Sequence, residues 1–509
     1  MAEYTFLAEK KYLLLPIRDG GKAQKIFFIC GDYSWDFDVQ LTDTPDRFAP
    51  FDLSPWQGKE CLLRGELPEN APFQQADKVS FSAPGEGKRP LLHFAAPFGW
   101  LNDPNGLYEY QGEFHLYYQH NPFGTGWGNM HWGHAVSKDL LRWEHLPEAL
   151  IPDAEGTMFS GSAIVDKENR SGLKKGEHPP IFLFYTAAAG HNKISAGKHF
   201  TLRQCISLDG GKIFEKTGRS LVSGIVYEDR DPKVVFVPEK DAFVMAYYYS
   251  APESHEFVLM ESKNLLDWQE FQRIILPGDW ECPDLFPVTL PDGAKKWIFT
   301  GACAVYRWGE FREGMLCLSE ETHSLTGYAE SKEYYASQVY DYWPEDGSVR
   351  QVSWLRLPLT GEDYNMQMAV PARIRGEYLE NQVWLKASPA PEFLQGMEKI
   401  ACTPETLPLL LQAHAGKPQA IRLEMAEDFA LSVGDALVRV EKGEIHCPSG
   451  VYALPAWQEK IWLVLDQGMA EVFAGDGVYR LAFRYEGKDA CSITAGEIAG
   501  AELYALREE

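Results

Sequence analysis

The chain has 509 residues, more than one ordinary core accommodates, so two or three domains are expected. Its formal charge of −25, without a basic cluster, argues against nucleic acid and anionic membrane surfaces as partners and favours a neutral or cationic ligand. The aromatic share of 13%, with 15 Trp and 24 Tyr, suits both a core and the stacking surfaces of a sugar pocket.

Nine cysteines are spread along the chain, with an odd total and no C-x-x-C pair. This pattern is not that of a disulfide framework and favours a reducing compartment. The N-terminal stretch "MAEYTFLAEKKYLLLPIRDGG" contains acidic residues and only a short apolar run, so it resembles neither a signal peptide nor a membrane span. We therefore expect a cytoplasmic location, or a secreted one if a leader has been removed.

In chain order, short strand-like runs fill residues 1 to about 70, and "PENAPFQQADK" with "SAPGEGKRP" is typical of a linker. From about residue 91 to 375 many short β-type runs recur, among them "EFHLYYQH", "IFLFYTA" and "AFVMAYYYS", without a long amphipathic helix between them. Beyond residue 375 a third β-rich region contains "KIWLVLDQGMAEVFAGDGVYRLAFRY", in which "AGDG" predicts a hairpin turn.

The middle region carries a weak internal repeat. "SKDLLRW" at 137–143 and "SKNLLDW" at 262–268 agree at five of seven positions, and "SLDGGKIF" at 207–214 places an aromatic one step later. Such repeats predict four-stranded units packed around an axis, and the length suits five units of roughly 55 residues. We therefore expect an all-β fold with a small N-terminal β-sandwich-like domain at 1–85, a five-bladed β-propeller at 86–370 and a C-terminal β-sandwich at 371–509. One large irregular sandwich, the alternative, leaves the repeat unexplained.

Three acidic motifs stand out in the middle region: Asp103 in "WLNDPNG", Asp231 in "DRDPKV" and Glu281 in "WECPDLF". Pro104 and Pro232 disfavour the helical conformation at the preceding Asp, so each Asp is expected at a strand end beside a stiff turn. Alone, "NDPNG" and "RDP" are ordinary turns, whereas a Glu beside Cys282 is unusual because a buried Glu needs a partner. In a propeller the innermost strands converge, so the three carboxylates can meet.

Residues 91 to about 300 resemble glycoside hydrolase family 32, the invertases, levanases and inulinases. "WLNDPNG", "RDPKV" and "ECPDLF" are similar to the three catalytic signatures of that family and follow its order, and "HLYYQHNPFG" and "FSGSA" match as well. The stretch that begins with "GTGWGNMHWGHAVSKDLLRW" resembles exo-acting levanases and exo-inulinases more than bacterial sucrose hydrolases. "VLDQGMAEVFAGDG" resembles the C-terminal sandwich of the family. Residues 1 to about 85 are not explained by its common two-domain plan.

The resemblance implies a funnel-shaped pocket and retaining hydrolysis of β-fructofuranosides. It makes Asp103 the nucleophile, Glu281 the general acid/base and Asp231 the stabiliser of the transition state. It also implies a set of substrate-binding residues: Asn102, Gln119, Trp127, Phe159, Ser160 and Arg230. Of these, Phe159 is expected beside the leaving group, and the permanent charge of Arg230 suits it to position a carboxylate such as that of Glu281.

The chemistry agrees with this assignment. Cleavage of a fructosyl bond develops positive charge on the ring, so the site needs an anion on one face and a proton donor on the other. Retaining enzymes hold these two carboxyl groups about 5–5.5 Å apart. Asp103 has to stay ionised, with Asn102 as a hydrogen-bond donor, whereas Glu281 has to hold a proton, which neighbouring anions favour.

No metal and no cofactor are expected. His131 and His134 in "HWGH" are three apart on a strand and so point to opposite faces, which is wrong for joint metal ligation. "GEGKRP" lacks the spacing and the helix of a phosphate loop. Cys282 has no apparent His partner and is not expected to act as a nucleophile.

We therefore expect an exo-acting β-fructosidase that releases fructose from levan- or inulin-type fructans and fructo-oligosaccharides, and that also cleaves sucrose. Three alternatives stay open: a fructosyltransferase on the same site, a non-catalytic fructan-binding protein, and an arabinan-cleaving hydrolase on a similar propeller. The preference between β-2,1 and β-2,6 linkages is also open. The N-terminal segment is a packing appendage, the contact of a homodimer, or part of the substrate funnel.

Overall fold

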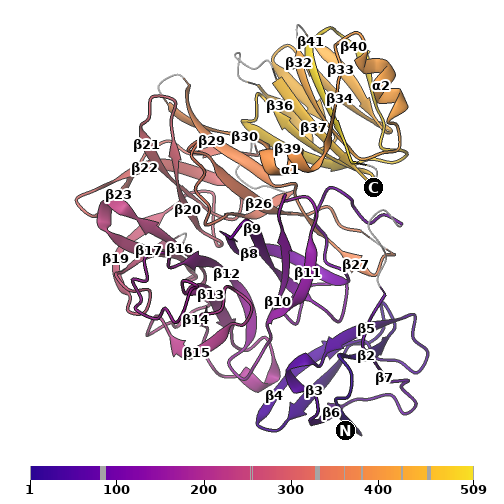
Figure 1. Cartoon of the computed structure of the whole chain (residues 1–509), viewed down its shortest axis with the longest axis vertical. Coiled ribbons are helices and arrows are strands. Elements are labelled where there is room, and N and C mark those ends of the chain that lie inside the picture. Colours follow the sequence, from indigo (N-terminus) through magenta and orange to yellow (C-terminus); the bar gives the residue numbers. More distant parts are fainter. Residues whose placement is uncertain are drawn as a thin grey trace.

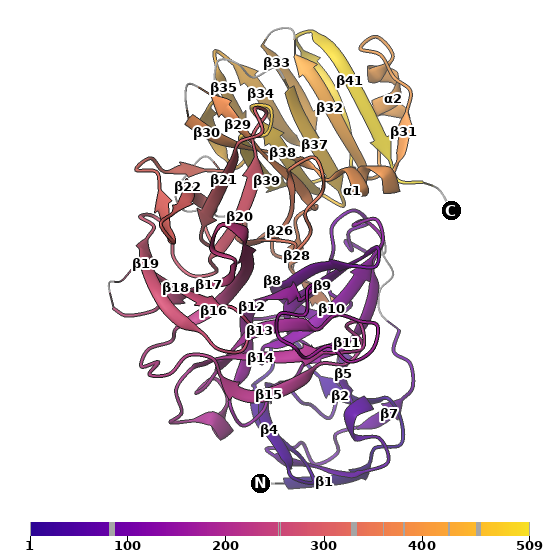
Figure 2. The same cartoon turned by 60° about the vertical axis from the view of Figure 1, so that its left-hand side comes forward.

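The computed structural model describes residues 2–80, 87–252, 254, 256–326, 333–359, 361–379, 382–425, 428–454 and 460–507. In these ranges nearly all regular structure is β-strand, beside two short α-helices, Pro391–Gly396 (α1) and Leu407–Ala413 (α2). The expectation of an all-β chain is therefore confirmed. Both ribbon views place the N-terminal strands at one end of the long axis and the C-terminal strands at the other (Figure 1, Figure 2).

The N-terminal strands form two sheets around one apolar cluster, in the orders β1-β6-β3-β4 and β5-β2-β7. In β3, Ile26, Phe28 and Cys30 are buried and alternate with less buried residues, as a strand with one face on a core requires. The strands are β1 (Ala2–Leu7), β2 (Tyr12–Ile17), β3 (Gln24–Cys30), β4 (Tyr33–Val39), β5 (Arg47–Asp52), β6 (Glu60–Gly65) and β7 (Gln74–Ala76).

Five sheets follow in the described part of residues 99–389, in the orders β11-β10-β9-β8-β27, β12-β13-β14-β15, β16-β17-β18-β19, β20-β21-β22-β23 and β25-β26-β29-β30. Strands β24 and β28 pair beside the last two of these sheets. The bounds are β8 (Gly99–Tyr110), β9 (Glu113–Asn121), β10 (His131–Ser137), β11 (Glu144–Leu150), β12 (Thr157–Val165), β13 (Ile181–Ala188), β14 (Thr201–Ser207), β15 (Glu215–Ser220), β16 (Arg230–Val237), β17 (Ala242–Tyr249), β18 (Glu256–Ser262), β19 (Gln269–Ile275), β20 (Asp284–Thr289), β21 (Lys295–Thr300), β22 (Val305–Arg312), β23 (Met315–Leu318), β24 (His323–Ser324), β25 (Tyr334–Val339), β26 (Val349–Leu355), β27 (Tyr364–Asn365), β28 (Gln367–Met368), β29 (Ala372–Leu379) and β30 (Gln382–Pro389).

The first strands of these sheets lie next to one another. β8 contacts β12, β12 contacts β16, β16 contacts β20, β20 contacts β25, and β25 contacts β8 again. Strand segments that are far apart in the sequence therefore meet in one central region.

The internal repeat is a turn that joins the third and fourth strands of three sheets. Ser137, Ser207 and Ser262 end β10, β14 and β18, and each contacts the Asp or Asn two residues later. That residue in turn accepts two backbone N–H groups: Asp139 from residues 141 and 142, Asp209 from 212 and 213, and Asn264 from 266 and 267. The repeat therefore marks equivalent places in successive sheets.

The boundary expected between residues 370 and 371 falls inside a sheet. β29 pairs with β26 from Val349 opposite Ile374 to Gln351 opposite Ala372, and β30 pairs with β29 along its length. Local sequence does not reveal this, because only pairing with a distant strand decides to which sheet a hairpin belongs.

The C-terminal strands form a six-stranded and a five-stranded sheet with a shared apolar cluster, in the orders β31-β41-β32-β37-β38-β39 and β36-β35-β34-β33-β40. The hairpin predicted at "AGDG" is confirmed, since β38 pairs with β39 up to Ala474 opposite Tyr479. The strands are β31 (Glu398–Ile400), β32 (Gln419–Met425), β33 (Phe429–Val433), β34 (Ala436–Glu441), β35 (Glu444–Cys447), β36 (Gly450–Ala453), β37 (Lys460–Asp466), β38 (Met469–Ala474), β39 (Tyr479–Arg484), β40 (Cys491–Ala495) and β41 (Ile498–Ala505).

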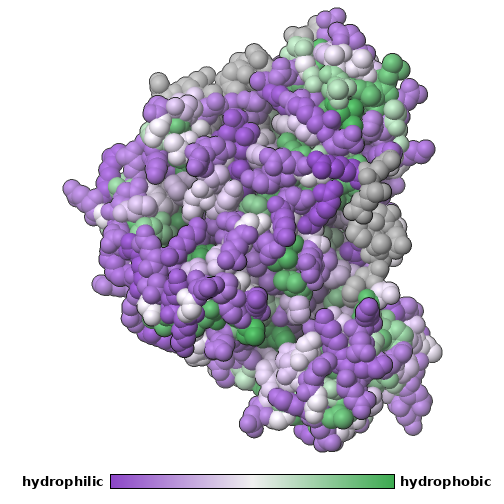
Figure 3. Space-filling view, in the orientation of Figure 1, coloured by the Kyte–Doolittle hydropathy of each residue, from purple (hydrophilic) through white to green (hydrophobic). Residues whose placement is uncertain are grey.

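The visible face of the molecule in Figure 3 is largely hydrophilic, with apolar side chains in small groups. All nine cysteines lie in the described ranges, and none of them forms a disulfide bond there. Among the described residues, no helix is both long and apolar enough to cross a membrane.

Candidate active site

Asp103 lies within strand β8, and the turn expected for "NDPNG" is not formed. The pairing of β8 with β9 shifts its register between Leu101 and Pro104 and again between Asn105 and Tyr108. Such irregularities accommodate Pro104, which has no N–H to donate to a ladder. The expectation of a turn is wrong because pairing with β9 overrides the local turn preference.

Asp231 and Glu281 have unusual backbone conformations. Asp231 is the second residue of β16, close to a strand end as expected, with φ at 64°. Glu281 and Cys282 precede β20, with φ at 37° and 41°. Residues with side chains adopt this left-handed region at a cost, which the surrounding contacts have to offset. The N–H of Asp231 donates to Thr186 Oγ1 at 3.0 Å, and the N–H of Cys282 donates to Asp231 Oδ2 at 3.1 Å.

The side chains of the three acids converge around Cys282 and Arg230. The Cys282 Sγ lies 3.6 Å from Asp103 Oδ2 and 3.5 Å from Asp231 Oδ2. Arg230 donates to Glu281 Oε2 from Nε at 3.2 Å and from Nη2 at 2.8 Å, while its Nε lies 3.7 Å from Asp231 Oδ2. The structure thus brings together carboxylates that three separate sheets or their loops supply.

Further side chains orient two of these acids. Ser160 of β12 donates its hydroxyl hydrogen to Asp103 Oδ2 at 2.6 Å. Tyr335 of β25 donates to Glu281 Oε1, and Trp280 Nε1 donates to the Tyr335 hydroxyl at 3.0 Å. Both oxygens of Glu281 therefore have a donor.

Burial and mutual repulsion change the protonation of this group. Burial raises the pKa of Asp103, and the hydrogen bond from Ser160 opposes that rise. Burial raises the pKa of Asp231 to about 7, with Arg230 lowering it and the charges of Glu281 and Asp103 raising it. Near neutral pH the site without substrate therefore keeps a proton, partly on Asp231, that an isolated carboxylic acid would have lost. Burial and the same anions also raise the pKa of the Cys282 thiol, so it acts as a donor.

The predicted substrate-binding residues divide into buried and accessible ones. Asn102 is buried and accepts a hydrogen bond from Trp100 Nε1 at 3.0 Å. Gln119 is buried too, and its amide nitrogen donates to the backbone oxygen of Met158 at 2.9 Å. Trp127, in contrast, is 53% exposed, with its ring centroid 5.8 Å from that of Phe159.

Sequence reasoning missed three side chains at this site: Thr186, Trp280 and Tyr335. The adjacent tyrosines in "EYYAS" are a signal, because successive residues of a strand face opposite sides. Tyr334 indeed donates to Glu471 of the C-terminal sheets, whereas Tyr335 reaches Glu281.

Two hollows lie in or beside the central sheets. A cleft of about 460 Å³ opens beside Arg230, lined by residues that include Phe200, Glu228 and Ser250. A larger cavity of about 1070 Å³ lies between the N-terminal sheets and strands β10 and β11. Asp103, Asp231 and Glu281 are not among the residues that line either hollow, so cavity size alone does not identify the reactive centre.

The histidines of "HWGH" contact different neighbours. The ring of His131 packs against Trp35 at 5.2 Å, whereas Nε2 of His134 lies 3.0 Å from Nδ1 of His115. Within the described ranges, no group of three or more His, Cys, Asp or Glu residues is arranged to hold a metal ion.

Most of the central sheets lie within a region that matches a known protein family. The family model described as "Glycosyl hydrolases family 32 N-terminal domain" matches residues 93–382. "Levanase" of Bacillus subtilis (strain 168) is 41% identical over 232 residues, which cover 44% of this chain and 33% of the levanase. The chain spans less than half the length of the curated relatives that it matches.

Solved structures resemble a still larger part of the chain. The exo-inulinase from Aspergillus awamori superimposes with a TM-score of 0.68 at 21% identity and covers 84% of this chain and 100% of its own. A structure described as glycoside hydrolase family 32 from Bifidobacterium adolescentis has a TM-score of 0.65 at 18% identity and covers 100% of this chain and 99% of its own. At these identities the likeness concerns the fold alone, and the second structure extends it to the N-terminal sheets.

Proposed function

Because the chain belongs to glycosyl hydrolase family 32, we propose that it hydrolyses terminal β-fructofuranosyl bonds with retention of configuration. One observation carries most weight: Asp103, Asp231 and Glu281 share contacts with the neighbouring Cys282 and Arg230. A retaining glycosidase needs two carboxyl groups on opposite sides of one glycosidic bond. Three carboxyl groups held close together repel one another and so cost stability. A catalytic role gives a reason for that cost, whereas binding of a sugar alone does not require it.

In this proposal Asp103 attacks the anomeric carbon while Glu281 donates a proton to the leaving oxygen. Glu281 then takes a proton from the water that releases fructose. The hydroxyl of Ser160 supports the ionised form of Asp103, because it donates to the carboxylate. Arg230 and Tyr335 orient Glu281 by contacts with its two oxygens.

Asp231 is proposed to stabilise the positive charge that develops on the sugar ring. With its pKa raised to about 7 by burial, it is partly protonated in the free site at neutral pH. Sugar hydroxyls that donate to Asp231 favour its ionised form. Substrate binding therefore releases a proton from Asp231, in a site where the proposed general acid, Glu281, requires one.

We also propose substrate contacts for Asn102, Trp127 and Phe159, with Trp127 offering an exposed ring face to a sugar. Gln119 and Ser160 are proposed to contact the substrate as well, and the hydrogen bond from the amide nitrogen of Gln119 to the backbone of Met158 holds that side chain in place. Arg230 is proposed to position the carboxylates of Glu281 and Asp231.

The five central sheets are proposed to be the blades of a five-bladed β-propeller, since their first strands contact one another in a closed order. The paired sheets at residues 2–76 and 398–505 are then β-sandwiches. Because β29 and β30 join the fifth sheet, the boundary of the last domain lies near residue 390 and not at 370.

The proposed substrates are fructans of levan or inulin type, fructo-oligosaccharides and sucrose, attacked from the fructosyl end. The names of the levanase and exo-inulinase relatives support this class. A fructosyltransferase, in which a sugar and not water receives the fructosyl group, is the alternative that shares the site. Product analysis at high sucrose distinguishes them, since transfer yields trisaccharides and hydrolysis yields free fructose.

The test is fructose release from sucrose, a short inulin series and levan by the parent chain and two variants. We expect Glu281→Gln to lower kcat by about 10²–10⁴-fold, the usual contribution of a general acid, and Asp103→Ala to lower it at least as much. Glu215→Gln, an exposed change on β15, is the control and should leave kcat unchanged. Parent-like turnover in both site variants would refute the catalytic assignment, and fructan binding without turnover by the parent would favour the binding protein.

A further inference from the structure

The N-terminal sheets contact two loops that border the candidate active site. The first loop, residues 122–130, connects β9 to β10 and carries Trp127. The second, residues 189–200, connects β13 to β14 and contains the short 3-10 helix η2 (Lys193–Ser195). Strand β4 of the N-terminal part contacts both of them.

The first loop is anchored on each side of Trp127. Phe123 is buried in the N-terminal cluster, with its ring centroid 4.6 Å from that of Phe37. Asn129 pairs with the backbone of Asp38: its amide nitrogen donates to the Asp38 oxygen at 2.8 Å, and its amide oxygen accepts the Asp38 N–H at 2.9 Å. Both ends of the segment that carries Trp127 are therefore held by the N-terminal sheets.

The second loop is anchored by a buried carboxylate. The side chain of Asp36 has no exposed surface, and its two oxygens accept the N–H groups of Lys193 and Ile194, each at 2.8 Å. Lys25 Nζ lies 3.4 Å from the same carboxylate. Because a buried carboxylate requires such donors, the path of the loop and the position of β4 depend on each other.

The two loops meet next to the reactive group. His191 of the second loop contacts Trp127 of the first edge to face, with ring centroids 5.7 Å apart, and both rings contact Phe159. Phe159 precedes Ser160, which is bonded to Asp103. Residues 189 and 198–200 of the second loop also line the cleft of about 460 Å³ beside Arg230. Three rings, those of Trp127, Phe159 and His191, therefore lie close to Ser160, and aromatic rings are surfaces on which sugars stack.

We propose that the N-terminal sheets are a specificity element, in which Asp36 and the Asn129 pairing hold this aromatic rim in position for the second and later sugar rings. Asp36 and Asn129 are positioning residues, since they act through Trp127 and His191 and do not touch the substrate. This inference rests on the proposed function.

The test compares Asp36→Asn with Asp38→Asn as a matched control. Both changes remove one charge from β4 beside Lys25, but only the Asp36 carboxylate accepts the loop N–H groups. KM and kcat are measured for methyl β-fructofuranoside, which has one ring, and for an inulin-type tetrasaccharide. We expect Asp36→Asn to raise KM for the tetrasaccharide by about fivefold or more, the effect of losing one such hydrogen bond, with little change for the one-ring substrate. Asp38→Asn should behave like the parent.

A second variant keeps the test decisive if Asp36→Asn does not fold. Asn129→Gly removes the pairing with β4 but tolerates the backbone φ of 47° at this position, and we expect the same selective rise in KM. Equal changes for both substrates in the folded variants, or none, would overturn the inference. Absence of turnover in the parent would instead overturn the proposed function.

Discussion

Asp231 combines two unfavourable features at a single residue. Its backbone has φ at 64°, and its carboxyl group is buried beside Asp103 and Glu281. Hydrogen bonds with Thr186 and Cys282 offset part of the cost. Backbone strain and charge repulsion at one residue persist only when many surrounding contacts hold that residue in place. Their combination is typical of functional sites.

Replacing Asp231 should stabilise the chain while it impairs catalysis. Because burial raises the pKa of Asp231 to about 7, the folded chain keeps a proton that the unfolded chain loses above about pH 4. Stability contributed at this residue therefore decreases as the pH rises from about 4 to about 7. At pH 8 we expect the unfolding free energy of Asp231→Asn to exceed that of the parent by a few kcal/mol, so that the variant melts at a higher temperature. Near pH 4 the two chains should have similar stability.

The backbone of the variant should not obscure this result, since Asn tolerates a left-handed φ at least as well as Asp. Calorimetry between pH 4 and 8 measures the difference, and fructose release measures the expected loss of turnover. A difference in melting temperature that stays constant over this range would contradict the explanation.

At the scale of elements, the position of Ser160 depends on a close approach of β12 to β13. The pairing of the two strands shifts its register between Phe159 and Gly161. A Cβ atom on Gly161 would lie 1.9 Å from the backbone oxygen of Phe184. Gly161 is also fixed by neighbouring elements, since its N–H donates to Asn105 Oδ1 at 3.2 Å and its oxygen accepts from Gln338 at 3.0 Å. The bulge directs Ser160 towards Asp103.

A side chain at Gly161 should therefore disturb both stability and catalysis. We expect Gly161→Ala to lower the unfolding free energy by about 1–3 kcal/mol, as overpacking usually does, and to lower kcat because Ser160 moves away from Asp103. Denaturant unfolding and turnover of sucrose measure the two effects. Gly126→Ala is the control for stability, since a Cβ there would meet no atom within 4 Å. Equal stability of the two variants would show that β12 has more room than its backbone contacts indicate.

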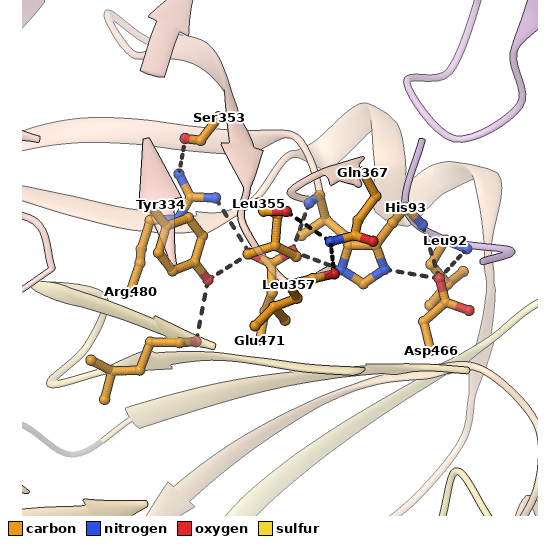
Figure 4. A network of polar contacts seen from close by, with 12 residues as sticks. Leu92, His93, Tyr334, Ser353, Leu355, Leu357, Gln367, Asp466, Glu471 and Arg480 are labelled. Carbon is orange, nitrogen blue, oxygen red and sulfur yellow. Dashed lines mark hydrogen bonds and ion pairs between the residues drawn. The ribbon is translucent and has the colours of Figure 1, made fainter. Parts of the chain in front are cut away.

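At the scale of the whole molecule, a buried charge network joins the C-terminal sheets to the central ones (Figure 4). His93 Nδ1 lies 2.8 Å from Asp466 and Nε2 lies 3.0 Å from Glu471, and none of these side chains is exposed. Glu471 also accepts a hydrogen bond from Tyr334, and Arg480 lies 3.4 Å from it. Removing one partner would leave a buried charge unpaired, which is strongly destabilising.

This junction should weaken at alkaline pH. Burial lowers the pKa of His93, but the hydrogen bonds with Asp466 and Glu471 and the charges of these carboxylates together outweigh burial and raise the pKa to about 9. For a raised histidine pKa, the stabilisation is complete below about pH 6.5 and is lost as the pH rises through about 9. We expect the unfolding free energy to fall by roughly 3 kcal/mol over this window.

His93→Gln provides the comparison, because a neutral amide does not titrate. The variant should be less stable than the parent at pH 6 and should show a much smaller decrease between pH 6.5 and 9. Calorimetric scans of both chains across this range measure the slopes. Parallel curves for the two chains would mean that His93 is not the group responsible.

Local patterns predicted a large part of this protein. Strand-like runs, the "AGDG" hairpin and the repeated Ser-x-Asp turns depend on side-chain alternation and turn chemistry within a few residues, which the sequence contains in full. The same holds for the three acidic motifs, because each is contiguous. Their grouping was expected from the family resemblance, and the structure brings them to Cys282 and Arg230.

Other features were decided only by the tertiary structure. The bulged strand at Asp103, the place of β29 and β30 in the fifth sheet, the contact of Tyr335 with Glu281, and the anchoring of two rim loops by β4 all join segments far apart in the chain. Local sequence was sufficient for the ionisable residue types, for most of the strands and for turns such as "AGDG", but not for the turn expected at "NDPNG". Strand register, burial and the partner of each buried carboxylate depend on packing between segments that are distant in the chain. The free energy of that packing cannot be inferred from a local sequence pattern.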